Sequence, residues 1–307
     1  MLDPSQLFDV TGEPPSARDL VFIHGLTGYV DAGDAVRLVT HHLLTALPSR
    51  EVARFDTDQL FDYRARRPVM AFDTDHWVDY ATPELVLWAL TDTEGGEFLL
   101  LTGPEPDFQW ERFVTAVQSL IEAYGVRLTI GINAIPMAVP HTRPIGLTRH
   151  ATSPELIPGN QPWLGHVQVP GSAAHLLEFR LGRQGRDAVG LAVHVPHYVA
   201  QSEFPPAALR LVEELSSVSG LRLPRDPLAE AAANALRDVD RQVAESAEAM
   251  AMVSALEQQY DAFVRARGGD GTIPAEENLP TAEELGAELE RFLAEHTRRW
   301  RGEEPDH

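Results

Sequence analysis

The sequence predicts an α/β fold, in which a mostly parallel sheet carries helices on both faces and a helical extension follows. Apolar strand-like runs alternate with amphipathic stretches over about the first 225 residues, as expected when helices connect parallel strands. Two runs, 97–103 and 127–135, have the apolar character of strands covered on both faces. The composition then changes near Asp226. We therefore expect an α/β core domain over 1–225 and a C-terminal helical extension over 226–307.

The elements of the core domain follow from these patterns in chain order. Short apolar or alternating runs bounded by polar residues, glycine or proline predict strands, and apolar residues spaced three to four apart predict helices. The expected strands are 20–26, 51–55, 68–73, 76–81, 84–90, 97–103, 127–135 and 187–196, with 68–81 as a hairpin. The expected helices are 31–47, 107–125, 171–185 and 205–220. No element is assigned to the proline-rich stretch from Pro136 to Pro162.

The extension begins with a long helical pattern. Asp226 is placed as an N-cap with a proline at the first helical position, and glycines follow the last apolar residue. The apolar residues have a spacing close to a coiled-coil seam, with gaps at Ser246 and Glu257. A single helix of about 40 residues would be ~60 Å long, so we expect it either to bend or to protrude.

A second helix is expected over 281–300, where Thr281 and Glu284 form a capping box. We expect the two helices of the extension to form an antiparallel hairpin. The hairpin should lie as a cap over the sheet edge, because a bare long helix would expose its apolar seam.

The charge and composition of the chain exclude several classes of function. The chain of 307 residues has a formal net charge of -21, and all 25 basic residues are arginines. Such a surface repels nucleic acid and anionic lipid. The absence of cysteine excludes disulfides and a cysteine nucleophile. No apolar run approaches the ~20 residues of a membrane span, and the N-terminal segment lacks the regions of a signal peptide. We expect a cytoplasmic protein that binds neither nucleic acid nor membrane.

The segment HGLTG (24–28) is compatible with the oxyanion loop of a hydrolase. That chemistry also needs a nucleophile elbow, Gly-x-Ser-x-Gly, and the sequence contains none. Clustered glycines in 25–35 could hold an anion at the next helix, but Asp31 and Asp34 would repel a phosphate. We favour a tight turn in which Asp31 caps the following helix. We expect no catalytic residue, metal site or cofactor.

Polar residues gather at the predicted ends of the strands. The carboxyl ends of parallel strands share one edge of a sheet, and ligands bind at that edge in open α/β sheets. The alternative is that the imidazoles anchor the proline-rich loops, and for any single histidine we favour this interpretation. The candidate ligand or partner edge comprises His24, Asp31, Asn133, His141, Arg143 and His197.

Five segments together resemble the proteasome assembly chaperone 2 family in its bacterial branch. They occur in the expected order between about residues 18 and 220, and the helical tail resembles the variable extension of that branch. The segments are GLTGYVDAGDA (25–35), DQLFDYRARRP (58–68), LLLTGPEPDFQWERF (99–113), GINAIPMAVPHTRP (131–144) and HVPHYVAQ (194–201).

The resemblance implies a fold similar to nucleoside phosphorylases, and self-assembly or pairing with a paralogue. Relatives in eukaryotes and archaea bind proteasome α-subunits, some through a C-terminal hydrophobic-Tyr-X tail. This chain ends in WRGEEPDH (300–307) and departs from that tail. Two functions are therefore considered. The first is a non-enzymatic oligomeric binding or assembly protein, with itself and possibly a proteasome subunit as partners. The second is a nucleoside-like small-molecule binder, or a nucleosidase- or phosphorylase-type enzyme, that uses the strand-end edge.

Overall fold

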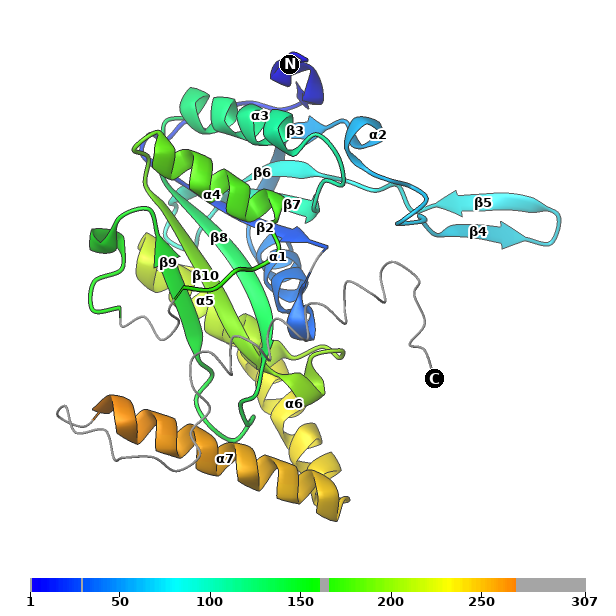
Figure 1. Cartoon of the computed structure of the whole chain (residues 1–307). Coiled ribbons are helices and arrows are strands. Elements are labelled where there is room, and N and C mark those ends of the chain that lie inside the picture. Colours follow the sequence, from blue (N-terminus) through cyan, green and yellow to red (C-terminus); the bar gives the residue numbers. More distant parts are fainter. Residues whose placement is uncertain (1, 29, 161–165, 269–307) are drawn as a thin grey trace.

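The computed structural model describes residues 2–28, 30–160 and 166–268. Its centre is an eight-stranded sheet with the strand order β1-β3-β6-β7-β2-β8-β10-β9, and β4 and β5 pair separately (Figure 1). The strands are β1 (Phe8–Val10), β2 (Leu20–Thr27), β3 (Ser49–Phe55), β4 (Met70–Asp73), β5 (His76–Tyr80), β6 (Val86–Thr91), β7 (Glu97–Pro104), β8 (Val126–Met137), β9 (Leu147–Ala151) and β10 (Ala188–Pro196). The α-helices are α1 (Ala35–Ala46), α2 (Thr57–Leu60), α3 (Trp110–Ala123), α4 (Ala173–Arg183), α5 (Pro205–Ser219), α6 (Asp226–Ala244) and α7 (Ala247–Gly268).

The direction of the strands confirms the expected fold class. The central strands β7, β2, β8 and β10 pair in parallel. Strand β3 runs the same way, because two antiparallel pairings through β6 connect it to β7. Only β1, β6 and β9 run in the opposite direction among the strands of this sheet in the described residues. The carboxyl ends of β2, β7, β8 and β10 therefore meet at one edge.

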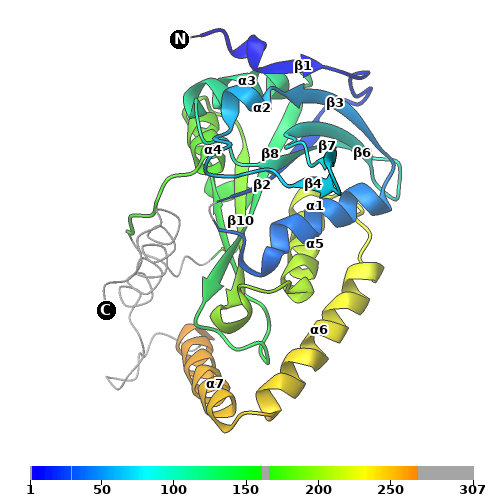
Figure 2. The ribbon, with the colours of Figure 1, turned by 90° about the vertical axis from the view of Figure 1, so that its right-hand side faces the viewer.

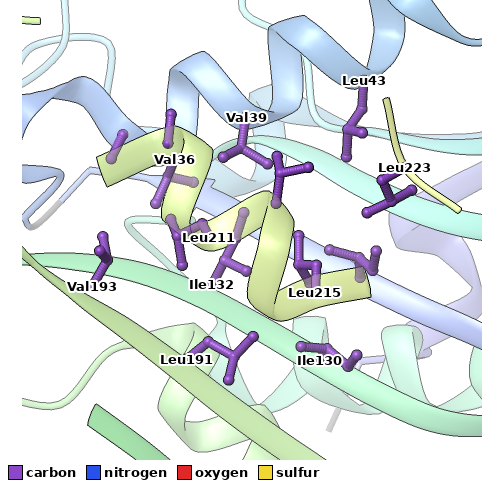
Figure 3. Close-up of a cluster of buried hydrophobic side chains, with 14 of the residues drawn as sticks. Val36, Val39, Leu43, Ile130, Ile132, Leu191, Val193, Leu211, Leu215 and Leu223 are labelled. Atoms are coloured by element: carbon purple, nitrogen blue, oxygen red, sulfur yellow. The ribbon is translucent and has the colours of Figure 1, made fainter. Parts of the chain in front are cut away.

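Helices cover both faces of the sheet, as predicted (Figure 2). On one face, α1 and α5 pack on the side chains of β2, β8 and β10, and Figure 3 shows Val36 and Leu211 of this cluster above Ile132. On the other face, α3 and α4 pack on Phe22 and its neighbours. Because successive strand residues point to opposite faces, Ile23 joins the first cluster and Phe22 the second. The near-continuous apolar runs in the sequence arise from this double coverage.

The hairpin β4–β5 is confirmed, and it projects from the body of the molecule (Figure 1). All nine residues of its two strands are exposed. Its ring contact between Phe72 and Trp77, with centroids 5.0 Å apart, lies within the hairpin itself. An isolated two-stranded hairpin of this kind is only marginally stable in water.

The long helical segment is not continuous: it bends between α6 and α7, which is one of the two arrangements expected for a helix of this length (Figure 2). The break coincides with the gap in the apolar seam at Ser246. The Ser246 hydroxyl accepts a hydrogen bond from the backbone N–H of Ala249 at 3.3 Å, and its carbonyl accepts one from Met250. Serine thus caps the new helix at the point where the seam is interrupted. The expected helix 281–300, its capping box and its pairing lie outside the described residues.

Three further differences concern short or strained segments. Helix α1 begins at Ala35 rather than at residue 31, because Gly33 and Asp34 have positive φ values of 65° and 51° in a 3-10 turn. Strand β9 lies in the proline-rich stretch to which no element was assigned, and β1, which was not predicted either, has only three residues.

No helix in the described part of the chain is long and apolar enough to span a bilayer.

Candidate functional site

The loops that follow β8 and β10 meet at the carboxyl edge of the sheet. The loop after β8 carries His141 and Arg143, and β10 continues into a 3-10 turn, His197–Val199. Tyr198 in this turn has ring contacts with both histidines, at centroid distances of 5.8 Å to His141 and 5.4 Å to His197. The structure therefore brings three predicted residues, His141, Arg143 and His197, to one end of the sheet.

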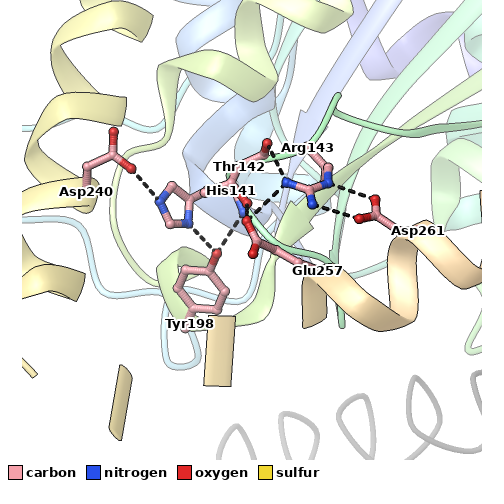
Figure 4. A network of polar contacts seen from close by, with 7 residues as sticks. All are labelled: His141, Thr142, Arg143, Tyr198, Asp240, Glu257 and Asp261. Carbon is pink, nitrogen blue, oxygen red and sulfur yellow. Dashed lines mark hydrogen bonds and ion pairs between the residues drawn. The ribbon is translucent and has the colours of Figure 1, made fainter. Parts of the chain in front are cut away.

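Three nitrogen atoms of His141 form hydrogen bonds (Figure 4). Its side chain is only 2% exposed, and its Nδ1 lies 2.6 Å from the Tyr198 hydroxyl. Its Nε2 lies 3.0 Å from Asp240 on α6, and its backbone N–H donates to the Tyr198 oxygen at 2.7 Å. Each polar group of the His141 ring has a partner when the Tyr198 hydroxyl donates to Nδ1 and Nε2–H donates to the Asp240 carboxylate. Burial raises the pKa of Tyr198 to about 12, so the hydroxyl keeps its proton.

Arg143 joins the same loop to α7. Its Nε and Nη2 donate to the two carboxylate oxygens of Asp261 at 2.8 and 2.7 Å, and its Nη1 donates to Glu257 at 3.0 Å. The bond to Asp261 raises the pKa of Arg143, and the pKa of Asp261 is lowered in turn. Thr142 also donates to Glu257, at 2.5 Å, and the Tyr260 hydroxyl donates to the carbonyl of Pro144 at 3.2 Å. The extension therefore lies against the strand-end loop, where a cap was expected.

The sequence reasoning did not find the partners in this network, Tyr198, Asp240, Glu257 and Asp261. A signal for two of them was present, since Glu257 and Asp261 are four residues apart on a helix and can hold one guanidinium. Within the described residues, the polar groups of His141 and Arg143 are bound to other parts of this chain. These contacts favour anchoring of the loop over a vacant ligand site.

His24 occupies a different place, on β2 beneath α4. It is 3% exposed, and its Nδ1 has no hydrogen-bond partner among the described residues. The ring lies over Gly131 of β8, where a Cβ would come 2.7 Å from it. Burial lowers the pKa of His24 to about 4, so the imidazole is neutral near pH 7.

A second imidazole is arranged in the same way on the edge strand β9. The His150 ring of β9 lies over Gly190 of β10, and Gly190 is the register partner of Gly131. His150 is bonded to Glu178 of α4 at 2.8 Å, and its ring centroid lies 6.1 Å from that of His175. Two paired glycines thus make room for two imidazoles under α4.

The other predicted residues have separate positions. The Asp31 carboxylate accepts hydrogen bonds from the N–H groups of Val36 and Arg37 at 2.8 and 3.0 Å, so it caps α1 as the sequence indicated. Burial raises its pKa. Asn133 is half-buried on β8, two residues beyond Gly131 and on the same face as it. His197 is exposed.

The arrangement therefore has a network around His141 and Arg143 and a separate imidazole layer around His24. In the part of the chain that the structure describes, no group of three or more histidine, aspartate or glutamate side chains is placed to hold a metal ion.

Comparisons with known proteins give a consistent result. A model of the PAC2 family matches residues 25–243. A Mycobacterium tuberculosis protein of unknown function, Rv2714, is 47% identical, with 95% of this chain and 96% of that chain covered and a TM-score of 0.85. A protein of unknown function from Corynebacterium glutamicum is 38% identical, covers 84% of this chain and 98% of its own, and has a TM-score of 0.81.

A third structure is a proteasome-assembly chaperone homologue from M. tuberculosis, Rv2125, with 24% identity, coverage of 76% of this chain and 100% of that chain, and a TM-score of 0.70. At that identity the likeness shows the fold alone. No match was found among curated proteins.

Proposed function

Since this chain belongs to the PAC2 family, we propose that it is a non-enzymatic oligomeric binding or assembly protein, similar to proteasome assembly chaperones. Its first partner is a second copy of itself, and a proteasome subunit is a further partner in the same proposal. We also propose that the protein is located in the cytoplasm. The name of Rv2125 as a proteasome-assembly chaperone homologue supports this choice of partner class.

The projecting hairpin is the observation that carries the proposal. Six large apolar side chains on it or at its base are between 43% and 74% exposed: Val69, Met70, Phe72, Trp77, Val78 and Tyr80. Large exposed apolar side chains gathered on one projecting element are typical of a protein–protein contact. The hairpin gains its missing hydrophobic contacts when another chain covers it.

Charges at the hairpin favour a second copy of this chain as the occupant. The hairpin carries Asp73, Asp75 and Asp79, whereas the loop at its base carries Arg64 and Arg67. Both arginines are exposed, and neither has an ion-pair partner within the described residues. The carboxylates of one hairpin can therefore pair with the base of another, which a self-complementary contact requires.

We further propose that the segment from residue 226 is a separate functional unit, the extension, that closes the carboxyl edge. The contacts of His141 with Asp240 and of Arg143 with Asp261 support this role. The closed edge argues against an open catalytic cleft at these residues.

The second candidate function is binding of a nucleoside-like small molecule at the predicted strand-end edge, of which His141, Arg143 and His197 lie together and His24 lies apart. The buried, unpartnered Nδ1 of His24 is the observation that favours it. This candidate predicts that nucleosides raise the melting temperature of the protein. It also predicts that alanine at His141 and Arg143 removes the shift, and the candidate fails if the shift is unchanged.

Native mass spectrometry of the protein, isolated gently from its own cells, tests the proposal. The assembly function predicts a defined oligomer with another protein in stoichiometric amount. A monomer without a partner would contradict it, and an oligomer carrying a small adduct would support the second candidate.

A further inference from the structure

Helix α4 is attached to the sheet by fewer apolar contacts than α3, which lies beside it on the same face (Figure 1). Among the described residues, α3 buries seven, six of them apolar, whereas α4 buries only Ala173, Leu177 and Leu181. The surface beneath the N-terminal half of α4 is polar, since His24 of β2 and His150 of β9 lie there. A helix with few buried apolar contacts can open locally while the rest of the fold stays closed.

Two imidazoles at this contact have a buried nitrogen without a partner. The Nδ1 atoms of His24 and His175 are buried, and neither has a hydrogen-bond partner within the described residues. His24 is 3% exposed, and the His175 ring centroid lies 6.1 Å from that of His150. A polar atom buried without a hydrogen bond costs free energy, so this layer weakens the packing of α4 on the sheet.

The titratable groups that face these two rings provide no free carboxylate for a new positive charge. Within the described residues, Glu178 of α4 and His150 of β9 act on the rings, and these two side chains are already bonded to each other at 2.8 Å. From β8, the residue in contact with the His24 ring is Gly131, which carries no charge. A proton on His24 would therefore leave a buried charge without a partner of its own.

Protonation of the imidazoles should favour an open helix for this reason. Burial lowers the pKa of His24 to about 4 from 6.5, and it also lowers the pKa of His175. The open state therefore binds protons that the closed state does not bind, and opening becomes easier as the pH falls from 6.5 toward 4. At pH 5.5, His24 alone should raise the opening equilibrium about tenfold relative to pH 7.5.

Glu105 acts in the opposite direction. It follows β7, and its carboxylate accepts the backbone N–H of Ala173 at the N-terminus of α4, at 2.5 Å. Burial raises the pKa of Glu105 above its ordinary value of 4.5, so in the range between these values the closed state binds a proton more readily than the open state. The contribution of the imidazoles is therefore measured as the difference between the unchanged protein and a variant that lacks His24.

We propose that α4 is an acid-sensitive cover of the sheet, which opens locally when His24 and His175 gain protons while the rest of the fold stays closed. Opening would expose Leu177 and Leu181 and the strand surface beneath them. This property goes beyond the proposed assembly function and does not depend on it.

Hydrogen-exchange mass spectrometry of the full chain at pH 7.5 and pH 5.5 tests the proposal, with α3 as the internal reference. Acidification slows the intrinsic exchange of both helices by the same factor, so the ratio of α4 protection to α3 protection measures local opening of α4. On acidification this ratio should fall about tenfold more in the unchanged protein than in the variant His24→Gln.

The matched control is His76→Gln, because the His76 side chain lies on the hairpin and is 64% exposed. It should respond to acid as the unchanged protein does. His175→Gln removes the imidazole on the helix side and should also reduce the response, which keeps the test valid if His24→Gln does not fold. Equal losses of protection in α3 and α4 would show general destabilisation and would overturn the proposal. A ratio that does not fall on acidification, or that falls equally in His24→Gln, would overturn it too.

Discussion

Arg143 and Asp261 form a two-point ion pair, with N–O distances of 2.8 and 2.7 Å, across 118 residues of sequence. One residue lies on the loop after β8 and the other on α7, so the pair joins the extension to the sheet edge. Bidentate geometry of this kind fixes orientation as well as distance.

Replacement of Arg143 with glutamine should loosen α7. We expect several-fold faster hydrogen exchange in α7 and no change in β2 or β8, because the guanidinium's hydrogen bonds within the described residues go to its own loop and to this helix. Hydrogen-exchange mass spectrometry measures the effect. Arg67→Gln is the matched control, since Arg67 is exposed and has no ion-pair partner among the described residues. Unchanged protection of α7 in the Arg143 variant would show that the pair does not hold the helix.

Replacement of Tyr198 with phenylalanine should destabilise the protein by about 1–3 kcal/mol, because two polar groups of buried His141 lose their partner. Urea unfolding followed by circular dichroism measures this loss. Tyr63→Phe removes a hydroxyl whose contact with Asp58 is solvent-exposed, and it should cost less than about 0.5 kcal/mol. Equal losses in the two variants would be inconsistent with the role assigned to Tyr198.

The protein should lose stability as the pH falls below neutrality. Burial lowers the pKa of His24 and His194 to about 4 from 6.5, and the pKa of His175 is lowered too. Between these values the unfolded chain binds protons that the folded chain does not, so stability falls as pH falls from 6.5 toward 4. By pH 5 each of the first two histidines should account for roughly 2 kcal/mol.

Urea unfolding at pH 7.5 and at pH 5.0 checks this direction. The variant His24→Gln should show a smaller difference between the two pH values, whatever its stability at neutral pH. A midpoint that rises on acidification would contradict the assignment of neutral, buried imidazoles.

Replacement of Gly190 with alanine should cost about 1–3 kcal/mol, because the new methyl group would overlap the His150 ring and force it away from Glu178. Gly171→Ala is the control, since its nearest neighbour is Trp110 at 3.9 Å. Thermal unfolding of the two variants compares them. If the Gly190 variant were as stable as the control, the His150 ring would have to move aside without any loss of stability, which contradicts this prediction.

Much of the fold was predictable because strands that helices cover on both faces have nearly continuous apolar sequences. Strands β7 and β8 are apolar where helices cover them on both sides. Strand β9 was missed because it is an edge strand with Arg149 and His150 at its centre. Those residues suit a strand only because Glu214 and Glu178 from distant helices pair with them.

The candidate edge was predictable only in part, for a similar reason. The position of His141 and Arg143 follows from the order of strands. Their partners do not, since Asp240 and Asp261 lie on helices whose charged residues have the pattern of a solvated face. The projection of the hairpin was not predictable either, because alternating apolar residues such as Phe72 normally indicate a covered face. Ligand or partner binding by the predicted edge stays a prediction.

Sedimentation velocity of the full chain beside its variant Phe72→Ser/Trp77→Ser is the most direct test of the assembly function. Both side chains are more than half exposed in the single chain, so the variant should fold normally. Phe179→Ser, on the outer surface of α4, is a matched exposed aromatic and serves as the control. We predict a defined oligomer for the unchanged chain and the control, and a monomer for the hairpin variant. A monomeric unchanged chain, or an oligomer that survives in the hairpin variant, would contradict self-assembly through the hairpin.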